Sequence, residues 1–208
     1  MDFTTTHAAV ISAPDKSRIQ ISPRQRIIVA LTGATGSILV IALRRLNIET
    51  HPVISKWAEK AVKYETDYTI ANIRGLADHV YNVHDMAAAI SSGSFRVDGM
   101  IVALCSVKTL ASINTGVCDD LISRAADVVL KERRKLVLAV RETPLSLIHL
   151  QNMVSVTQAG AIIFPPAPAF YHKPASIDDL VDHSVGKMLD LFDLDTAEFE
   201  RWEGLKKQ

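Results

Sequence analysis

Two segments that combine glycine with hydroxyl residues follow apolar runs and are suited to binding an anion. TGATGS (32–37) follows RIIVAL, and CSVKTLASINTG (105–116) follows GMIVAL. Small residues let the backbone approach an anion, and the N-terminus of a following helix offers unpaired N–H groups and partial positive charge. Ser106 and Thr109 add hydroxyl groups at the second segment, where helix capping is the alternative role. Both segments are therefore candidates for a phosphate site.

Two cations share one face of a predicted helix. Arg124 and Lys131 are seven residues apart in the helical pattern over 119–132, which places them two turns apart on one side. Such a pair can grip a phosphate. The alternative is a solvated surface, with Asp120 and Asp127 as the partners of Arg124.

Further candidates follow later apolar runs. Arg141 and Glu142 come directly after KLVLAV (135–140) and suit acid–base catalysis, or form a loop ion pair. FPPAPAFYH (164–172) is stiffened by prolines and would hold Tyr171 against a planar ligand or a neighbouring subunit. Cys105 could be a nucleophile, but a buried structural thiol is the favoured interpretation.

The elements that position these residues alternate along the chain. Predicted strands are short, charge-poor apolar runs at 26–31, 50–55, 99–104, 135–140 and 161–164. Predicted helices cover 37–46, 56–66 and on toward 78, 107 onward, 119–132, 146–160 and about 177–192. This alternation predicts a parallel sheet covered on both faces, with the ligand beyond the carboxyl ends of the strands. The loops near 32, 55, 105, 141 and 165 should therefore line the site.

Composition excludes several classes. The chain has 208 residues, 48% hydrophobic and 22% charged, with 23 basic and 23 acidic residues. This is typical of a single globular domain, and the zero formal net charge disfavours nucleic-acid binding. Two cysteines form no disulfide framework, and no cysteine–histidine spacing predicts a zinc site, so we expect no metal.

The ends and the domain limits can also be predicted. Residues 1–25 have no hydrophobic period and are interpreted as a flexible leader, which suits either a mitochondrial presequence or a plain tail in the cytoplasm. The uncharged stretch 27–43 is interrupted by TGATGS, so it favours strand, turn and helix over a membrane span. Residues 26–194 form the predicted domain, and 195–208 a C-terminal tail.

The order of these motifs resembles one family closely. TGATG, ISKW, CSxKTLA, SRAADVxLKERRxLVL, RETPLSxIHLxNM, GAxIFPPxPAFY and a final RWEG are similar to the UbiX-like flavin prenyltransferases, and especially to fungal phenylacrylic acid decarboxylase proteins of that family. The likeness runs from about Arg26 to Gly204 and covers nearly all of the chain beyond the leader.

The resemblance implies a fold and an activity. Members have one flavodoxin-like, Rossmann-type α/β/α domain with a mainly parallel sheet, and they assemble into a dodecamer with sites at subunit interfaces. They join a dimethylallyl group from dimethylallyl phosphate to N5 and C6 of reduced FMN. The product, prenylated FMN, serves a UbiD-type decarboxylase, in fungi one acting on cinnamic acids. No metal takes part.

The resemblance also implies roles for individual residues. The FMN-binding set would be Gly33, Ala34, Thr35, Ser55, Ser106, Thr109 and Arg124. The donor-binding set would be Lys131, Arg141, Tyr171 and Lys187. The catalytic set would be Glu142 for proton handling, Lys131, and Trp202, which closes the site from the tail of a neighbouring subunit.

The sequence departs from the family pattern in two places that bear on activity. About four residues are missing after TGATG, and Lys187 replaces an arginine, which keeps the charge but loses the two-pronged hydrogen bond. An FMN-binding paralogue with weakened transferase activity, acting as a flavin carrier or assembly partner, is therefore the alternative. A third hypothesis is a flavoprotein decarboxylase of peptidyl cysteine, but its substrate-clamp motif is not evident here.

Overall fold

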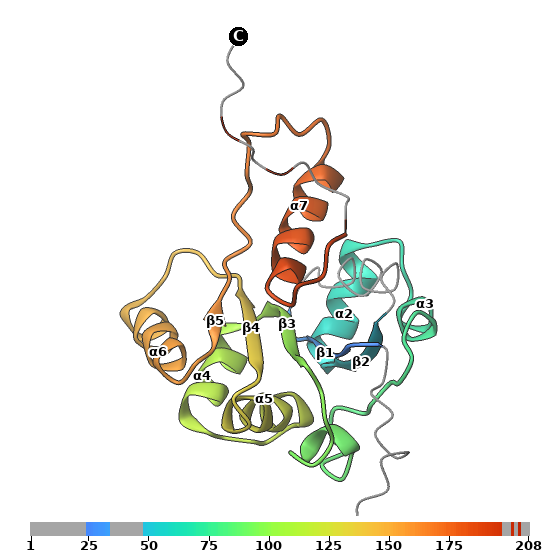
Figure 1. The fold of residues 1–208 in the computed structure, drawn as a ribbon, viewed down its shortest axis with the longest axis vertical. Helices are drawn as coiled ribbons and strands as arrows, with labels where there is room; N and C mark the ends of the chain where they lie inside the picture. The colour runs from blue at the N-terminus through green and yellow to red at the C-terminus, as the bar shows by residue number, and fades with distance from the viewer. Residues whose placement is uncertain (1–23, 34–47, 197–200, 202–203, 205–208) are drawn as a thin grey trace, which may run out of the picture.

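The structure, a computed structural model, describes residues 24–33, 48–196, 201 and 204. The described part is built around one sheet of five parallel strands, in the order β2-β1-β3-β4-β5 (Figure 1). This strand order is that of flavodoxin-like folds, whose ligands bind where the order reverses, between β1 and β3. The predicted fold class is confirmed.

The strands and helices lie close to where their sequence patterns placed them. The strands are β1 (Arg26–Leu31), β2 (Glu49–Ile54), β3 (Gly99–Cys105), β4 (Lys135–Val140) and β5 (Ile162–Ile163). The helices are α2 (Lys56–Glu65), α3 (Ile70–Gly75), the 3-10 turn η2 (Ala89–Ser91), α4 (Val107–Thr115), α5 (Leu121–Lys131), α6 (Leu147–Gln158) and α7 (Ile177–Asp190). The last strand is shorter than its apolar run predicted, and the expected helix over 37–46 lies outside the described residues.

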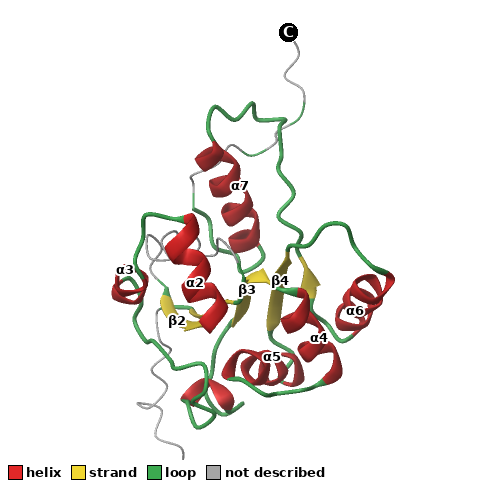
Figure 2. Ribbon diagram, turned by 180° about the vertical axis from the view of Figure 1, so that it is seen from behind, coloured by secondary structure: helices red, strands yellow, loops and turns green. Residues whose placement is uncertain are grey.

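Alternate residues of each strand enter two separate cores, one on each face of the sheet. In β1, Ile28 and Ala30 pack with α4, α5 and α6, whereas Ile27, Val29 and Leu31 pack with α2, α3 and α7. The two helical layers are visible on either side of the sheet in Figure 2. Burial of both faces explains why these strands carry apolar residues at every position rather than at alternate ones.

Side-chain caps fix where the helices begin. Ser55, Ser106, Asp120, Ser146 and Ser176 each precede a helix, and each side chain accepts a hydrogen bond from the backbone N–H three residues on. The first two caps directly follow β2 and β3, so α2 and α4 start at the carboxyl edge of the sheet. Among the described residues, no helix is long and apolar enough to cross a membrane.

Candidate functional site

The ends of β1 and β3 are tied together at the carboxyl edge of the sheet by one buried hydroxyl group. Thr32 donates a hydrogen bond to the carbonyl oxygen of Leu104 (2.7 Å) and accepts one from the backbone N–H of Ser106 (2.9 Å). Thr32 is 6% exposed. This contact lies at the reversal of strand order, where folds of this kind bind their ligands.

Two helix N-termini face one cavity beside this tie. The cavity has a volume of about 520 Å³, and its lining includes Thr32, Ser55, Ser106 and Thr109. Ser55 caps α2 and Ser106 caps α4, and the hydroxyl oxygens of Ser106 and Thr109 lie 3.1 Å apart. Backbone N–H groups, hydroxyl groups and two positive helix ends make this cavity fit a phosphate group.

Charged and aromatic side chains complete the rim of the phosphate-type cavity. Lys56, Lys108 and Asp120 belong to its lining. Partial burial opposes the charge of Lys108, but nearby Asp120 raises the pKa of this amine, so it stays protonated. Trp57, which is 72% exposed, lies on the same rim, and its position within the ISKW motif is the sequence signal that could have identified it.

A second, mainly apolar cavity lies between the end of β3, the proline-rich loop and α7. It has a volume of about 490 Å³, and its lining includes Leu104, Pro166, Val181, Met188 and two charged residues, Glu65 and Arg141. Leu104 also accepts the Thr32 hydrogen bond, so the two cavities flank the same strand end. A cation at the wall of an apolar cavity suits a ligand with an anionic head and a hydrocarbon group.

Arg141 and Glu142 lie at the end of β4, as predicted. The backbone N–H of Arg141 donates to the carbonyl oxygen of Cys105 (3.4 Å), which ties β4 to β3. The carboxylate of Glu142 accepts from the backbone N–H of Thr143 (3.0 Å), and the side chain is exposed. The structure therefore places Arg141 in the lining of the apolar cavity and an exposed carboxylate on the next residue along the chain.

Tyr171 contacts α7 and Lys187 lies within it, but they differ in their contacts. The hydroxyl group of Tyr171 is 2.6 Å from Nε2 of His183, a buried histidine of α7 that the sequence analysis did not single out. His183 lies among apolar residues at helical spacing, so the sequence pattern indicated a helix but not a functional role for this histidine. Lys187 pairs with Asp190 (3.4 Å) and is not part of the lining of the apolar cavity.

Arg124 and Lys131 are not brought to the other site residues within one chain. Arg124 donates to the carbonyl oxygen of Ser91 (3.1 Å) and to Asp127 (2.8 Å), which is one of the surface partners that the sequence offered. Lys131 ends α5 and pairs with Glu132, four residues before β4 begins at the opposite edge of the sheet. Within one chain both cations pair with neighbouring acidic residues, and their joint grip on a phosphate stays a prediction.

The remaining predicted residues can be placed only in part. Gly33 follows the end of β1, where an added Cβ would lie 3.8 Å from the carbonyl oxygen of Leu104, an ordinary contact distance. Ala34, Thr35 and Trp202 lie outside the described residues. Cys105 is fully buried, and burial raises the pKa of its thiol to about 12, so it is a structural thiol rather than a nucleophile.

Comparison with known proteins agrees with this geometry. The flavoprotein family model matches residues 16–194. The mitochondrial flavin prenyltransferase PAD1 of Saccharomyces cerevisiae is 54% identical over 198 residues, which is 92% of this chain and 82% of the yeast protein. The chain belongs to the flavoprotein family and, within it, to the UbiX-like flavin prenyltransferases.

Two solved structures are similar over most of the chain. The crystal structure of AnUbiX (PadA1) in complex with FMN and dimethylallyl pyrophosphate has 68% sequence identity and a TM-score of 0.86, covering 88% of this chain and all of that one. A dodecameric FMN-dependent UbiX-like decarboxylase from Escherichia coli O157:H7 has 52% identity and a TM-score of 0.83, covering 87% of this chain and all of that one.

Proposed function

We propose that this chain is a flavin prenyltransferase, which joins a dimethylallyl group from dimethylallyl phosphate to reduced FMN and makes prenylated FMN. The observation that carries the proposal is the pair of cavities at the end of β3, one suited to a phosphate and the other apolar with a cation at its wall. AnUbiX, with both FMN and dimethylallyl pyrophosphate in its structure, supports the same pairing of ligands.

The phosphate-type cavity would hold FMN through its backbone and hydroxyl donors. Ser55, Ser106 and Thr109 contribute hydroxyl groups at the starts of α2 and α4. Bound there, reduced FMN supplies the nucleophilic nitrogen of the reaction. Gly33, Ala34 and Thr35 remain proposed members of this set, because they come shortly after β1 in the sequence.

The apolar cavity would hold the prenyl donor. Arg141 would bind its phosphate. The apolar wall would keep water away from the dimethylallyl group, because water would otherwise react with the allylic cation that this group forms. Glu142, with its exposed carboxylate, would handle the proton lost in ring closure. Tyr171, held by His183, offers an aromatic ring and a hydroxyl near α7.

Assembly would supply what a single chain lacks. Apolar side chains of α6, among them Leu147, Ile148 and Val154, are exposed in the isolated chain, as is Phe170 of the proline-rich loop. Such patches favour contact with another copy, and the relative from E. coli O157:H7 is dodecameric. We propose that this chain forms a comparable homo-oligomer in which Arg124, Lys131 and Trp202 act at sites of neighbouring copies.

The recipient and the compartment complete the proposal. The product would pass to a UbiD-type decarboxylase. The site uses FMN as its substrate, so it must release prenylated FMN to another protein. The proposed location is the mitochondrion or the cytoplasm. The Ser- and Thr-rich leader and the likeness to a mitochondrial yeast enzyme favour the mitochondrion.

The test follows flavin mass in an anaerobic mixture of purified protein, reduced FMN and dimethylallyl phosphate. A gain of one prenyl unit supports the transferase. Bound but unmodified FMN supports the FMN-binding paralogue. The ion pair between Lys187 and Asp190 favours this alternative. If FMN does not bind at micromolar concentration, both functions are wrong.

A matched pair of variants tests the phosphate-type cavity. Ser106→Ala removes a helix cap that faces the cavity, whereas Thr69→Ala removes an equivalent exposed cap at α3. Each cap contributes about 1 kcal/mol to stability. We expect weaker FMN binding only in Ser106→Ala; an equal effect of both variants would mean that the loss came from stability rather than from contact with FMN.

A further inference from the structure

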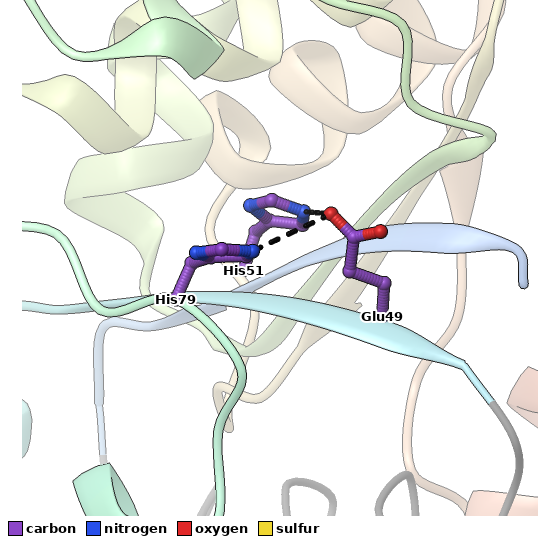
Figure 3. Close-up of side chains that lie close together, drawn as sticks. All are labelled: Glu49, His51 and His79. Carbon is purple, nitrogen blue, oxygen red and sulfur yellow. Dashed lines mark hydrogen bonds and ion pairs between the residues drawn. The ribbon is translucent and has the colours of Figure 1, made fainter. Parts of the chain in front are cut away.

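A carboxylate and two imidazole rings converge at the amino edge of β2, away from both cavities. Nε2 of His51 lies 3.0 Å from Oε1 of Glu49, and Nε2 of His79 lies 3.6 Å from the same oxygen (Figure 3). Glu49 and His51 are two residues apart in a strand and so share one face. His79 belongs to the segment after α3, and its backbone N–H donates to the carbonyl oxygen of Thr50 in β2.

The other polar atoms of this cluster are held by neighbouring side chains. Nδ1 of His51 lies 3.0 Å from the hydroxyl group of Tyr81, and Oε2 of Glu49 accepts from Nε of Arg26 at 3.0 Å. Outer contacts of this kind orient the ligands of metal sites. The Nε2 atoms of both rings lie near Oε1 of Glu49, and the two rings are stacked with their centroids 4.9 Å apart.

The distances match those of a small metal site. Zinc binds histidine nitrogen and carboxylate oxygen at about 2.0–2.2 Å, so ligand atoms in a tetrahedral site lie about 3.3 Å apart. The separations of 3.0 and 3.6 Å fall on either side of that value, and the three ligand atoms all lie within 4.8 Å of one another. Two histidines and one glutamate leave a fourth position for water.

We propose that Glu49, His51 and His79 form a binding site for a divalent transition-metal ion of the zinc class, with solvent as the fourth ligand. The site is separate from the proposed reaction. β2 has six residues and rises about 3.3 Å per residue, so the cluster lies roughly 15–20 Å from Ser55. A bound ion would join β2 to the segment after α3 and strengthen that edge of the sheet.

The charges of the cluster favour binding of a cation with moderate affinity. Glu49 supplies a negatively charged oxygen, and the second oxygen of the same carboxylate is paired with Arg26 at 3.0 Å. Because Arg26 neutralises part of this charge, we expect weaker binding than an isolated carboxylate would give.

The test uses the untagged, full-length protein, freed of metal by a chelator that is then removed. Zn²⁺ binding is measured by calorimetry, and Co²⁺ is added as a spectroscopic probe of tetrahedral geometry. We expect one Zn²⁺ per chain and the intense visible absorption of tetrahedral cobalt. Binding should weaken at least tenfold in His79→Gln and in Glu49→Gln, and should be unchanged in the control His149→Gln, whose histidine lies at the start of α6.

Three outcomes would overturn the proposal. The first is no binding at micromolar zinc, which would leave an ion-pair cluster only. The second is equal binding by the wild-type protein and both cluster variants, which would place the metal elsewhere. The third is octahedral cobalt absorption in the wild-type protein. FMN content, measured on the same samples, is expected to stay constant, so failure here is distinguishable from failure of the proposed function.

Discussion

Replacing Thr32 with valine tests whether one hydroxyl group organises the carboxyl edge of the sheet. Valine has nearly the same shape but can neither donate to Leu104 nor accept from Ser106, so it leaves a partly buried carbonyl oxygen and a partly buried N–H without the contacts of 2.7 and 2.9 Å. Each buried polar group left unsatisfied costs about 1–3 kcal/mol. We expect Thr32→Val to lower the free energy of unfolding by roughly 2–4 kcal/mol.

The assay is thermal unfolding of the FMN-free protein, with Thr32→Ser as the matched control. A loss of 2–4 kcal/mol corresponds to a fall in melting temperature of roughly 5–12 °C in a chain of this size. Serine keeps both hydrogen bonds and loses one methyl group, worth about 1 kcal/mol. Because Ser106 caps α4 and lines the phosphate-type cavity, FMN binding should weaken more in the valine variant. Melting temperatures within about 2 °C of each other for the two variants would refute the reasoning.

Three further predictions concern a thiol, a lysine and a carboxylate. Burial raises the pKa of Cys105 to about 12, whereas the other cysteine, Cys118, is only partly buried. A thiol reagent at mild alkaline pH should therefore modify Cys118 alone, and loss of this modification in Cys105→Ser would contradict the prediction. Lys187→Arg should tighten prenyl-donor binding without changing FMN binding, and unchanged or weaker donor binding would count against its role. Burial opposes ionisation of Asp120, but hydrogen bonds from Ser123 hold its pKa below the ordinary value. Its stabilisation is therefore present above roughly pH 4 and lost as pH falls through the lower folded-state pKa. Denaturant unfolding should show a smaller loss of stability on acidification in Asp120→Asn than in the wild-type protein, and equal losses would show that the carboxylate contributes nothing.

The sheet could be predicted from the sequence because each strand shows its environment in its composition. RIIVAL and KLVLAV place apolar residues at successive positions, and in a parallel sheet both faces of such strands are buried. The boundary of β5 was less predictable. Ile162 and Ile163 of its run AIIF pair with residues of β4, and the backbone N–H of Phe164 still donates to the carbonyl oxygen of Leu138 before the chain enters the proline-rich loop.

The candidate site was predictable where it depends on strand ends and not where it depends on distant contacts. Ser55 and Ser106 follow directly after buried strands, and parallel strands bring such positions to one edge. The contact between Tyr171 and His183 joins a loop to a helix, and no local pattern encodes it.

The cluster at β2 shows the same limit more clearly. Cysteine and histidine spacings predict a metal site only where the ligands lie close together along the chain. Glu49 and His51 alternate within a strand, and His79 reaches them through a segment 28 residues further on that runs beside β2. The two-residue spacing predicts that Glu49 and His51 share one face of a strand. The third ligand atom, from His79, is added only by a tertiary contact.

Two features of the isolated chain have a common explanation in assembly. Lys131 lies at the amino edge of the sheet, far from the cavities at the carboxyl edge, and α6 exposes Leu147 and Ile148 to solvent. Within one chain, the first would be an ordinary surface lysine and the second an unexplained apolar patch. If copies pack through α6, the patch is buried and cations of one chain can meet the cavities of another. We therefore expect a charge-introducing change such as Ile148→Asp to lower both the oligomeric state and donor use, whereas a monomeric variant with full activity would show that one chain holds a complete site.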